Sequence, residues 1–250
     1  MIKNFYFKSF FIAAMALLFS CKSHFDLVRA NRNQYAINSA VPADSAVIKT
    51  YLPYKLKMDE QMNAVIGRTD SALVKTRGPE SRLGNFFADA CLSEAKKIDN
   101  TIDFAMPSTT GGLRNSLPKG DIKLSNVFEL MPFENELLVL KLKGKDVLDL
   151  CKFIAQTGGQ PVSALKLKIE NKAPVEILIN GKAFDVSKTY NVLTSDYIAG
   201  GGDDSFGMAN PLEKKVLKLK VRDALIQYIK NQTSAGKTIT AQLDGRIVAN

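Results

Sequence analysis

The sequence predicts a mixed α/β domain in which short strands and amphipathic helices alternate along the chain. Apolar residues recur at helical spacing in some segments and alternate with polar residues in others. Gly, Pro and Asn clusters separate these segments, and no internal repeat or low-complexity run interrupts them. The chain of 250 residues is long enough for one large domain with a substantial core.

The first 20 residues are predicted to be an export signal, because Lys3 and Lys8 precede an apolar run too short to span a bilayer stably. The tetrapeptide ending at Cys21, Leu-Phe-Ser-Cys, resembles the cleavage motif of bacterial lipoproteins. It predicts lipid attachment to Cys21 and an exported protein anchored on the periplasmic or cell-surface side of a membrane. An ordinary secretory signal is the alternative. Polar residues 21–43 are then interpreted as a tether, and residues 44–250 as the folded domain.

In the first half of the domain, we expect a helix over 45–58 that starts after Asp44, and a strand at 64–67. A second helix starts at Pro79-Glu80-Ser81 and has apolar residues at helical spacing, which predicts that they lie in the core: Leu83, Phe86, Phe87, Ala90 and Cys91. Asp89 on this helix is a candidate ligand, with a capping or exposed role as the alternative. Cys91 and Cys151 are expected to be buried free thiols.

The rest of the domain is predicted to consist of strands with two further helices between or after them. Strands are expected at 102–107, 122–130, 136–144, 164–171, 174–181, 182–185 and 190–199, and helices at 145–155 and 216–229. Asn180-Gly181 indicates a tight hairpin, and Thr157-Gly158-Gly159 is typical of a helix C-terminus.

The stretch from Pro107 to Asn135 combines features of a binding site. A Gly-Gly turn allows close backbone approach to a ligand, and Arg114 beside it offers a forked donor for phosphate or carboxylate. Phe133 follows a proline and is a candidate stacking platform. Together they predict a ligand with an anionic part and a flat ring. The alternative is a turn, a surface arginine and a core phenylalanine.

The overall charge of +9 agrees with an anionic ligand or an anionic surface. The lysines are scattered over predicted strands and helices, and no basic stripe with interleaved aromatic residues indicates a nucleic-acid partner.

Five blocks of sequence, in order and with suitable spacing, resemble the C-terminal domain of the 5'-nucleotidase family. They lie between residues 46 and 247 and read ESRLGNFFADA, TTGGLRNSLPKGDIKLSNVFELMPFEN, LKGKDVLDL, YNVLTSDYIAGGGDDSF and DGRI. The resemblance implies the mixed α+β fold of that domain and a pocket for a nucleotide or nucleoside. It places Phe133 and Tyr197 at the two base-stacking aromatics, Asn135 at the residue that bonds the base edge, and Asp203 at the acceptor for ribose hydroxyls.

The resemblance also places Arg114 and Arg77 toward the ribose and phosphate, and Gly158 at a backbone contact with the ligand. Two positions depart from the family pattern. Thr109 stands where the family usually has asparagine, which puts one ribose contact in doubt. Asp204 stands where glycine is usual, and it adds a negative charge close to the expected phosphate.

The family's hydrolases carry their two metal ions on a separate N-terminal metallophosphatase domain, and such a site needs several Asp, His and Asn ligands. This chain has a single histidine, His24, far from every motif. We therefore expect no catalytic residue, metal or cofactor in this chain, which alone should be inactive; an all-carboxylate site is the alternative.

The leading hypothesis is the substrate-binding half of a split 5'-nucleotidase-type enzyme, which presents substrate to a separate metallophosphatase chain holding the divalent metals. The alternatives are a surface nucleoside-binding lipoprotein without a partner enzyme, and a degenerate structural lipoprotein that keeps the fold.

Overall fold

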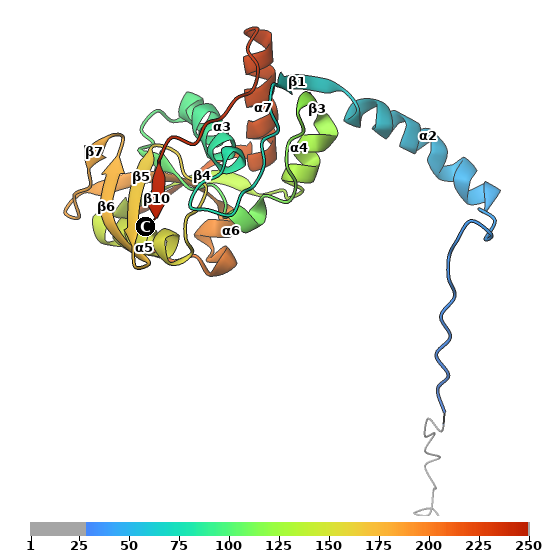
Figure 1. The fold of residues 1–250 in the computed structure, drawn as a ribbon, viewed down its shortest axis with the longest axis horizontal. Helices are drawn as coiled ribbons and strands as arrows, with labels where there is room; N and C mark the ends of the chain where they lie inside the picture. The colour runs from blue at the N-terminus through green and yellow to red at the C-terminus, as the bar shows by residue number, and fades with distance from the viewer. Residues whose placement is uncertain (1–28, 250) are drawn as a thin grey trace, which may run out of the picture. The chain divides into compact units, whose positions relative to one another are not determined.

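The computed structural model describes residues 29–249 (Figure 1). The predicted signal sequence, Cys21 and His24 lie outside the described residues. Residues 29–44 hold one turn and no helix or strand. Helix α2 (Ser45–Met62) follows and extends four residues beyond the predicted end. The Asp44 carboxylate starts α2 by accepting from the backbone N–H groups of Ala46 and Val47, at 2.8 and 3.2 Å.

A central four-stranded sheet organises the rest of the chain. Its strands, in spatial order, are β2 (Phe104–Ala105), β8 (Thr189–Ser195), β4 (Glu136–Lys143) and β9 (Glu213–Lys220). Strand β4 is antiparallel to both neighbours, whereas β2 runs parallel to β8. Strand β4 is buried on both faces: Leu137 and Val139 join one hydrophobic cluster, while Leu138, Leu140 and Leu142 join the other.

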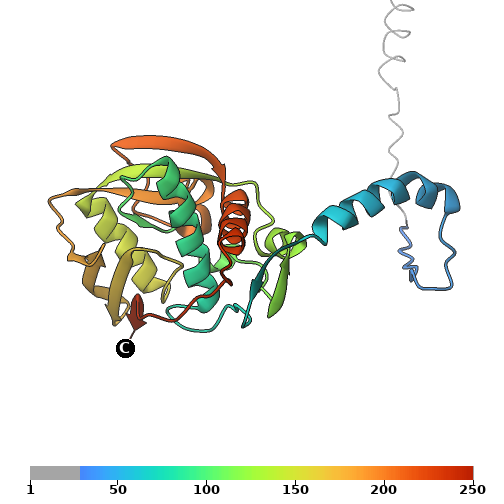
Figure 2. The ribbon, with the colours of Figure 1, turned by 90° about the horizontal axis from the view of Figure 1, so that it is seen from above.

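Helices α3 (Arg82–Ile98) and α7 (Val221–Ser234) cover one face of this sheet and pack against each other (Figure 2). Ser81 caps α3, since its hydroxyl accepts from the Gly84 N–H at 3.0 Å. The predicted apolar face of α3 is buried as expected, Cys91 included. A two-stranded sheet of β1 (Val65–Thr69) and β3 (Gly120–Lys123) adjoins α7.

Helix α5 (Gly144–Gln156) lies against the opposite face of the central sheet and also packs on a second sheet. The strands of that sheet, in order, are β10 (Ile247–Ala249), β5 (Leu165–Glu170), β6 (Ala173–Ile179) and β7 (Lys182–Ala183). The predicted hairpin is confirmed, because Asn180 and Gly181 both have positive φ, 51° and 73°. Cys151 is a buried free thiol. The prediction of a mixed α/β fold is confirmed.

The predicted strand at 122–130 is wrong for most of its length. Strand β3 ends at Lys123, and helix α4 (Leu124–Leu130) follows. Leu124, Val127 and Leu130 are spaced by three residues, so a helix turns all three toward the same core. A strand would place Val127 on the opposite face.

The predicted helix at 216–229 begins too early, because residues up to Lys220 belong to β9 and α7 starts at Val221. Leu217 and Leu219 alternate with exposed lysines, which is the period of a strand on a half-buried sheet.

Three predicted strands are clearly shorter than expected. Strand β7 covers only Lys182 and Ala183 of 182–185. Only Phe104 and Ala105 of 102–107 pair in the sheet. Strand β8 ends at Ser195, whose side chain caps the short helix α6 (Asp196–Ala199). In the part of the chain that the structure describes, no helix is both long and apolar enough to cross a bilayer.

Candidate functional site

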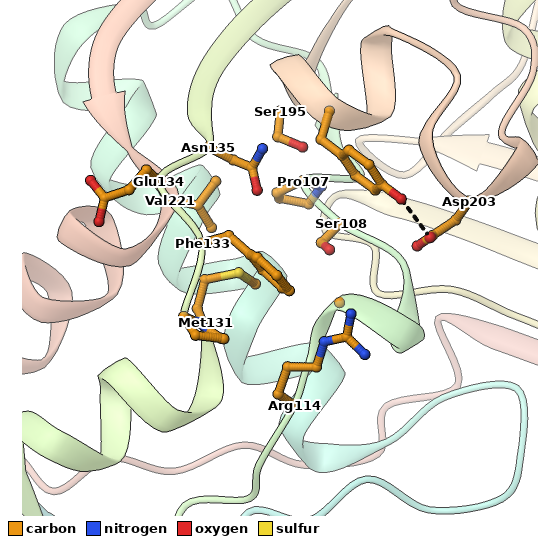
Figure 3. Close-up of a pocket in the computed structure, with 13 residues that line it drawn as sticks. Pro107, Ser108, Arg114, Met131, Phe133, Glu134, Asn135, Ser195, Asp203 and Val221 are labelled. Atoms are coloured by element: carbon orange, nitrogen blue, oxygen red, sulfur yellow. Dashed lines mark hydrogen bonds between the residues drawn. The ribbon is translucent and has the colours of Figure 1, made fainter. Parts of the chain in front are cut away.

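A cavity of about 570 Å³ opens where the loop after β2, the loop between α4 and β4, and the segment following β8 converge (Figure 3). Its size is typical of a small-molecule site. Phe133, Asn135, Tyr197, Asp203 and Arg114 all line it. These five residues are separated by up to 89 positions in the sequence, and the fold brings them to one cavity.

Two aromatic side chains provide flat walls. Phe133 is half-buried against the core below α4, and the Arg114 guanidinium lies 5.1 Å from its ring centroid. Tyr197 is carried by α6 and remains 49% exposed. Its ring rests on the backbone of Gly202, where an added Cβ would lie only 2.4 Å from a ring carbon. The glycine at 202 is therefore needed for the ring to adopt this position.

Asp203 provides a fixed carboxylate at the cavity edge. It lies in the short 3₁₀ helix η3 (Gly202–Asp204) with left-handed backbone, φ 55°. One carboxylate oxygen accepts from the Tyr197 hydroxyl at 2.9 Å, and the other accepts from the Thr109 hydroxyl. The hydrogen bond to the Asp203 carboxylate raises the pKa of Tyr197. Each oxygen keeps a further lone pair, so Asp203 can still accept from two hydroxyl groups of a ligand.

Thr109 has a role that the sequence comparison did not indicate. The departure from asparagine put one ribose contact in doubt. In the structure Thr109 is 4% exposed, and its hydroxyl donates to the Asp203 carboxylate and so orients it. Asp204, the second departure, is exposed and has a φ of 57°, so the turn is retained with a left-handed aspartate.

Asn135 faces the cavity with its carbonyl oxygen (Figure 3). Its amide nitrogen donates to the Asp196 carboxylate at 2.9 Å, and a carboxylate can only accept, which sets the orientation of the amide. Asn135 therefore presents an acceptor for a polar N–H group on the edge of a flat ligand.

Arg114 stands between this cavity and a shallower one of about 270 Å³, because Arg114 and Asp203 line both. The shallower cavity is also lined by Thr157 and Gln160 at the end of α5. Gly158 adjoins Thr157 with φ 79° but lines neither cavity. Arg77 lies on an exposed loop and also lines neither. The ligand contacts assigned to Gly158 and Arg77 by resemblance stay predictions.

Several lining residues were not singled out from the sequence. They include Ser108, Glu134, Met131 and Ser195, the last of which is 2% exposed. Ser195 is the last residue of β8 and the N-cap of α6. A serine at the end of an apolar run is typical of a helix N-cap, and this pattern could have indicated Ser195 from the sequence.

The described residues contain no group of three or more His, Cys, Asp or Glu side chains placed to hold a metal ion. Asp89, the candidate ligand on α3, has a structural partner. Its carboxylate pairs with Arg246 at 2.7 and 3.0 Å and accepts from the Ser163 hydroxyl at 2.6 Å. This contact ties α3 to the segment preceding β10.

The structure is a mixed α/β domain whose cavity has two aromatic walls, the forked cation of Arg114 and the oriented carboxylate of Asp203. A family model described as "5'-nucleotidase, C-terminal domain" matches residues 64–211, more than half of the chain. The chain belongs to this family, whose domain has a substrate-binding role in 5'-nucleotidase-type proteins.

Known relatives agree with this assignment. A 5'-nucleotidase of Vibrio vulnificus is 28% identical over 67% of this chain, and Protein UshA of Escherichia coli is 29% identical over 65%. The solved structure of a 5'-nucleotidase precursor from Thermus thermophilus superposes with a TM-score of 0.70 at 26% identity and covers 84% of this chain. This chain spans 31%, 30% and 44% of those proteins respectively.

Proposed function

We propose that this chain is the nucleotide- or nucleoside-binding half of a split 5'-nucleotidase-type phosphoester hydrolase. It would capture the ligand and present it to a separate metallophosphatase chain that holds the divalent metals. The observation that carries the proposal is the convergence of Phe133, Tyr197, Asn135 and Asp203 on one cavity. Family membership supports the same ligand class.

The cavity chemistry matches each part of a nucleoside. A base inserted between Phe133 and Tyr197 gains stacking on both faces, and stacking on one aromatic side chain is worth ~1–3 kcal/mol. The Asn135 carbonyl oxygen accepts from the base edge, and Asp203 accepts from the ribose hydroxyls. Arg114, at the junction of the two cavities, supplies a cation for the phosphate side. This chain's residues bind and orient the ligand, and we assign no chemical step to them.

The direct test is calorimetric titration of the purified protein with adenosine and with AMP, paired with a phosphate-release assay in the presence of divalent metals. We expect binding of both ligands and no phosphate release. Failure to bind either ligand would favour a structural lipoprotein of the same fold. Phosphate release that follows the protein through purification would refute the assignment of catalysis to another chain.

A pull-down from native membranes tests the partner. Co-purification of a metallophosphatase, and phosphate release from AMP by the recovered complex, are the expected results. Binding of adenosine with no phosphatase recovered would instead support a nucleoside-binding lipoprotein that acts alone.

We further propose that residues 1–20 are a signal sequence, that residues 21–43 form a tether to a lipidated Cys21, and that residues 44–250 form the binding domain. The sequence motif at Cys21 supports this proposal. Metabolic labelling with a radioactive fatty acid should mark the wild-type protein and fail to mark Cys21→Ala. Equal labelling of both proteins would contradict it.

A further inference from the structure

The loop between α4 and β4, residues 131–135, carries Phe133 and Asn135 and is held by the start of α7. The Glu134 carboxylate accepts from both Lys220 and Arg222. The backbone N–H of Val221 donates to the backbone carbonyl oxygen of Asn135 at 2.9 Å. The base-facing residues of the cavity are therefore attached to α7 through a short run of contacts, which we term the α7 clamp (residues 220–222).

Arg222 makes most of the contacts within the α7 clamp. One guanidinium nitrogen donates to the carbonyl oxygens of Met131 and Phe133, at 3.4 and 3.3 Å, and another donates to Glu134. The guanidinium also lies over the ring of Phe128 in α4, 4.1 Å from the ring centroid. A planar, forked cation can make these contacts at once, whereas the single ammonium of lysine cannot.

The environment of Arg222 is energetically unfavourable for a charged side chain whose only role is packing. Its side chain is 8% exposed, so its charge is largely removed from water. Its Nε is buried without a hydrogen-bond partner among the described residues. It also occupies the first turn of α7, where the helix dipole disfavours a positive charge. An apolar side chain would avoid all three costs, so packing alone does not account for an arginine here.

We propose that Arg222 is a positioning residue for the base subsite: it fixes the loop at 131–135 so that the Phe133 ring and the Asn135 amide face the ligand. This inference rests on the proposed function for its ligand. It adds a residue outside the matched motifs, on a helix that contributes only Val221 to the cavity lining.

The test compares adenosine affinity, by calorimetry, for the wild-type protein and for Arg222→Met and Arg222→Lys. We expect Arg222→Met to weaken binding about tenfold, in the range of one lost stacking contact. Arg222→Lys should weaken binding by a smaller factor, because lysine keeps the charge but not the forked geometry. In a Phe133→Ala background, Arg222→Met should weaken binding less than it does in the wild-type background, because only the contribution of Asn135 is left to lose once the ring is gone.

A spectroscopic readout tests the loop without a ligand. The chain contains no tryptophan, so Phe133→Trp introduces a single emission reporter into the loop. Adding Arg222→Met should shift the emission maximum to the red as the loop loosens. Thermal unfolding of each variant identifies any that fail to fold. If Arg222→Met does not fold, the same measurements are made on Arg222→Lys and on Phe128→Leu. The second variant removes the ring on which the Arg222 guanidinium lies.

Three results would overturn the inference. The first is adenosine affinity within about twofold of wild type for the folded Arg222 variants. The second is an equal loss of affinity with and without Phe133→Ala. The third is an unchanged emission maximum. The emission result stands even if the wild-type protein does not bind adenosine, so failure of the proposed function and failure of this inference remain distinguishable.

Discussion

Replacing Phe133 with alanine is the sharpest test of the cavity as a site for a flat ring. The substitution removes one wall and leaves the Tyr197 wall and the Asp203 carboxylate in place. Because stacking on one aromatic face contributes ~1–3 kcal/mol, adenosine affinity should fall roughly 5- to 150-fold. The ring is half-buried against the core, so part of the ~3–5 kcal/mol typical of Phe→Ala at a fully buried site should also be lost from folding stability.

The assay is calorimetric titration with adenosine, accompanied by thermal unfolding of the same samples. Phe184→Ala is the matched control, because Phe184 is also half-buried and its ring stacks on Tyr190 with centroids 5.5 Å apart. Phe184 follows β7 in the second sheet and does not line the cavity. We expect Phe184→Ala to lower the unfolding temperature and to leave adenosine affinity unchanged.

Equal affinity losses in Phe133→Ala and Phe184→Ala would show that the loss reflects general destabilisation. Wild-type affinity in folded Phe133→Ala would refute the stacking role outright. Only a loss of adenosine affinity that is confined to Phe133→Ala supports the proposal that the Phe133 ring forms a wall of the binding site.

Three further predictions concern the polar end of the cavity and its supports. Thr109→Val should weaken ribonucleoside binding by roughly fivefold, about 1 kcal/mol for a lost hydrogen bond that orients Asp203, while Thr109→Ser retains it in the same titration. Gly202→Ala should displace the Tyr197 ring and lower adenosine affinity with little change in the unfolding temperature. Hydrogen bonds with its two basic partners lower the pKa of Glu134 from 4.5 to about 2. Its contribution to stability is therefore present above pH 4.5 and lost as the pH falls toward 2, so the difference in unfolding temperature between wild type and Glu134→Gln should be largest near neutral pH.

Each of these predictions has a contradicting result. Equal adenosine affinities of Thr109→Val and Thr109→Ser would show that the hydroxyl at position 109 does not contribute to ligand binding. Unchanged adenosine binding by Gly202→Ala would show that the tyrosine ring does not need its observed position. A difference in unfolding temperature between wild type and Glu134→Gln that is as large at pH 2 as at neutral pH would mean that the Glu134 charge does not stabilise the loop.

Periodicity predicted the long buried elements well and the transitions between elements poorly. The apolar face of α3 repeats over several turns, and β4 contains a continuous run of buried apolar residues, so each gives a sustained signal. At 122–130 a strand of four residues passes directly into a helix, and at 216–229 the strand and helix meet at Lys220. Both junctions contain apolar residues on either side, and no Gly or Pro marks the change of period.

The sequence by itself determined the fold class and the family resemblance, and that resemblance pointed to the aromatic, amide and carboxylate residues that line the cavity, because they lie within the resembling blocks. Tertiary structure decided what those residues contact. The bond from Thr109 to Asp203 spans 94 positions, and that from Arg222 to Glu134 spans 88. Such contacts depend on how β4, α6 and α7 meet around the central sheet. Resemblance to the family therefore identified residues that line the cavity, and only the packed structure identified the residues that hold them in place.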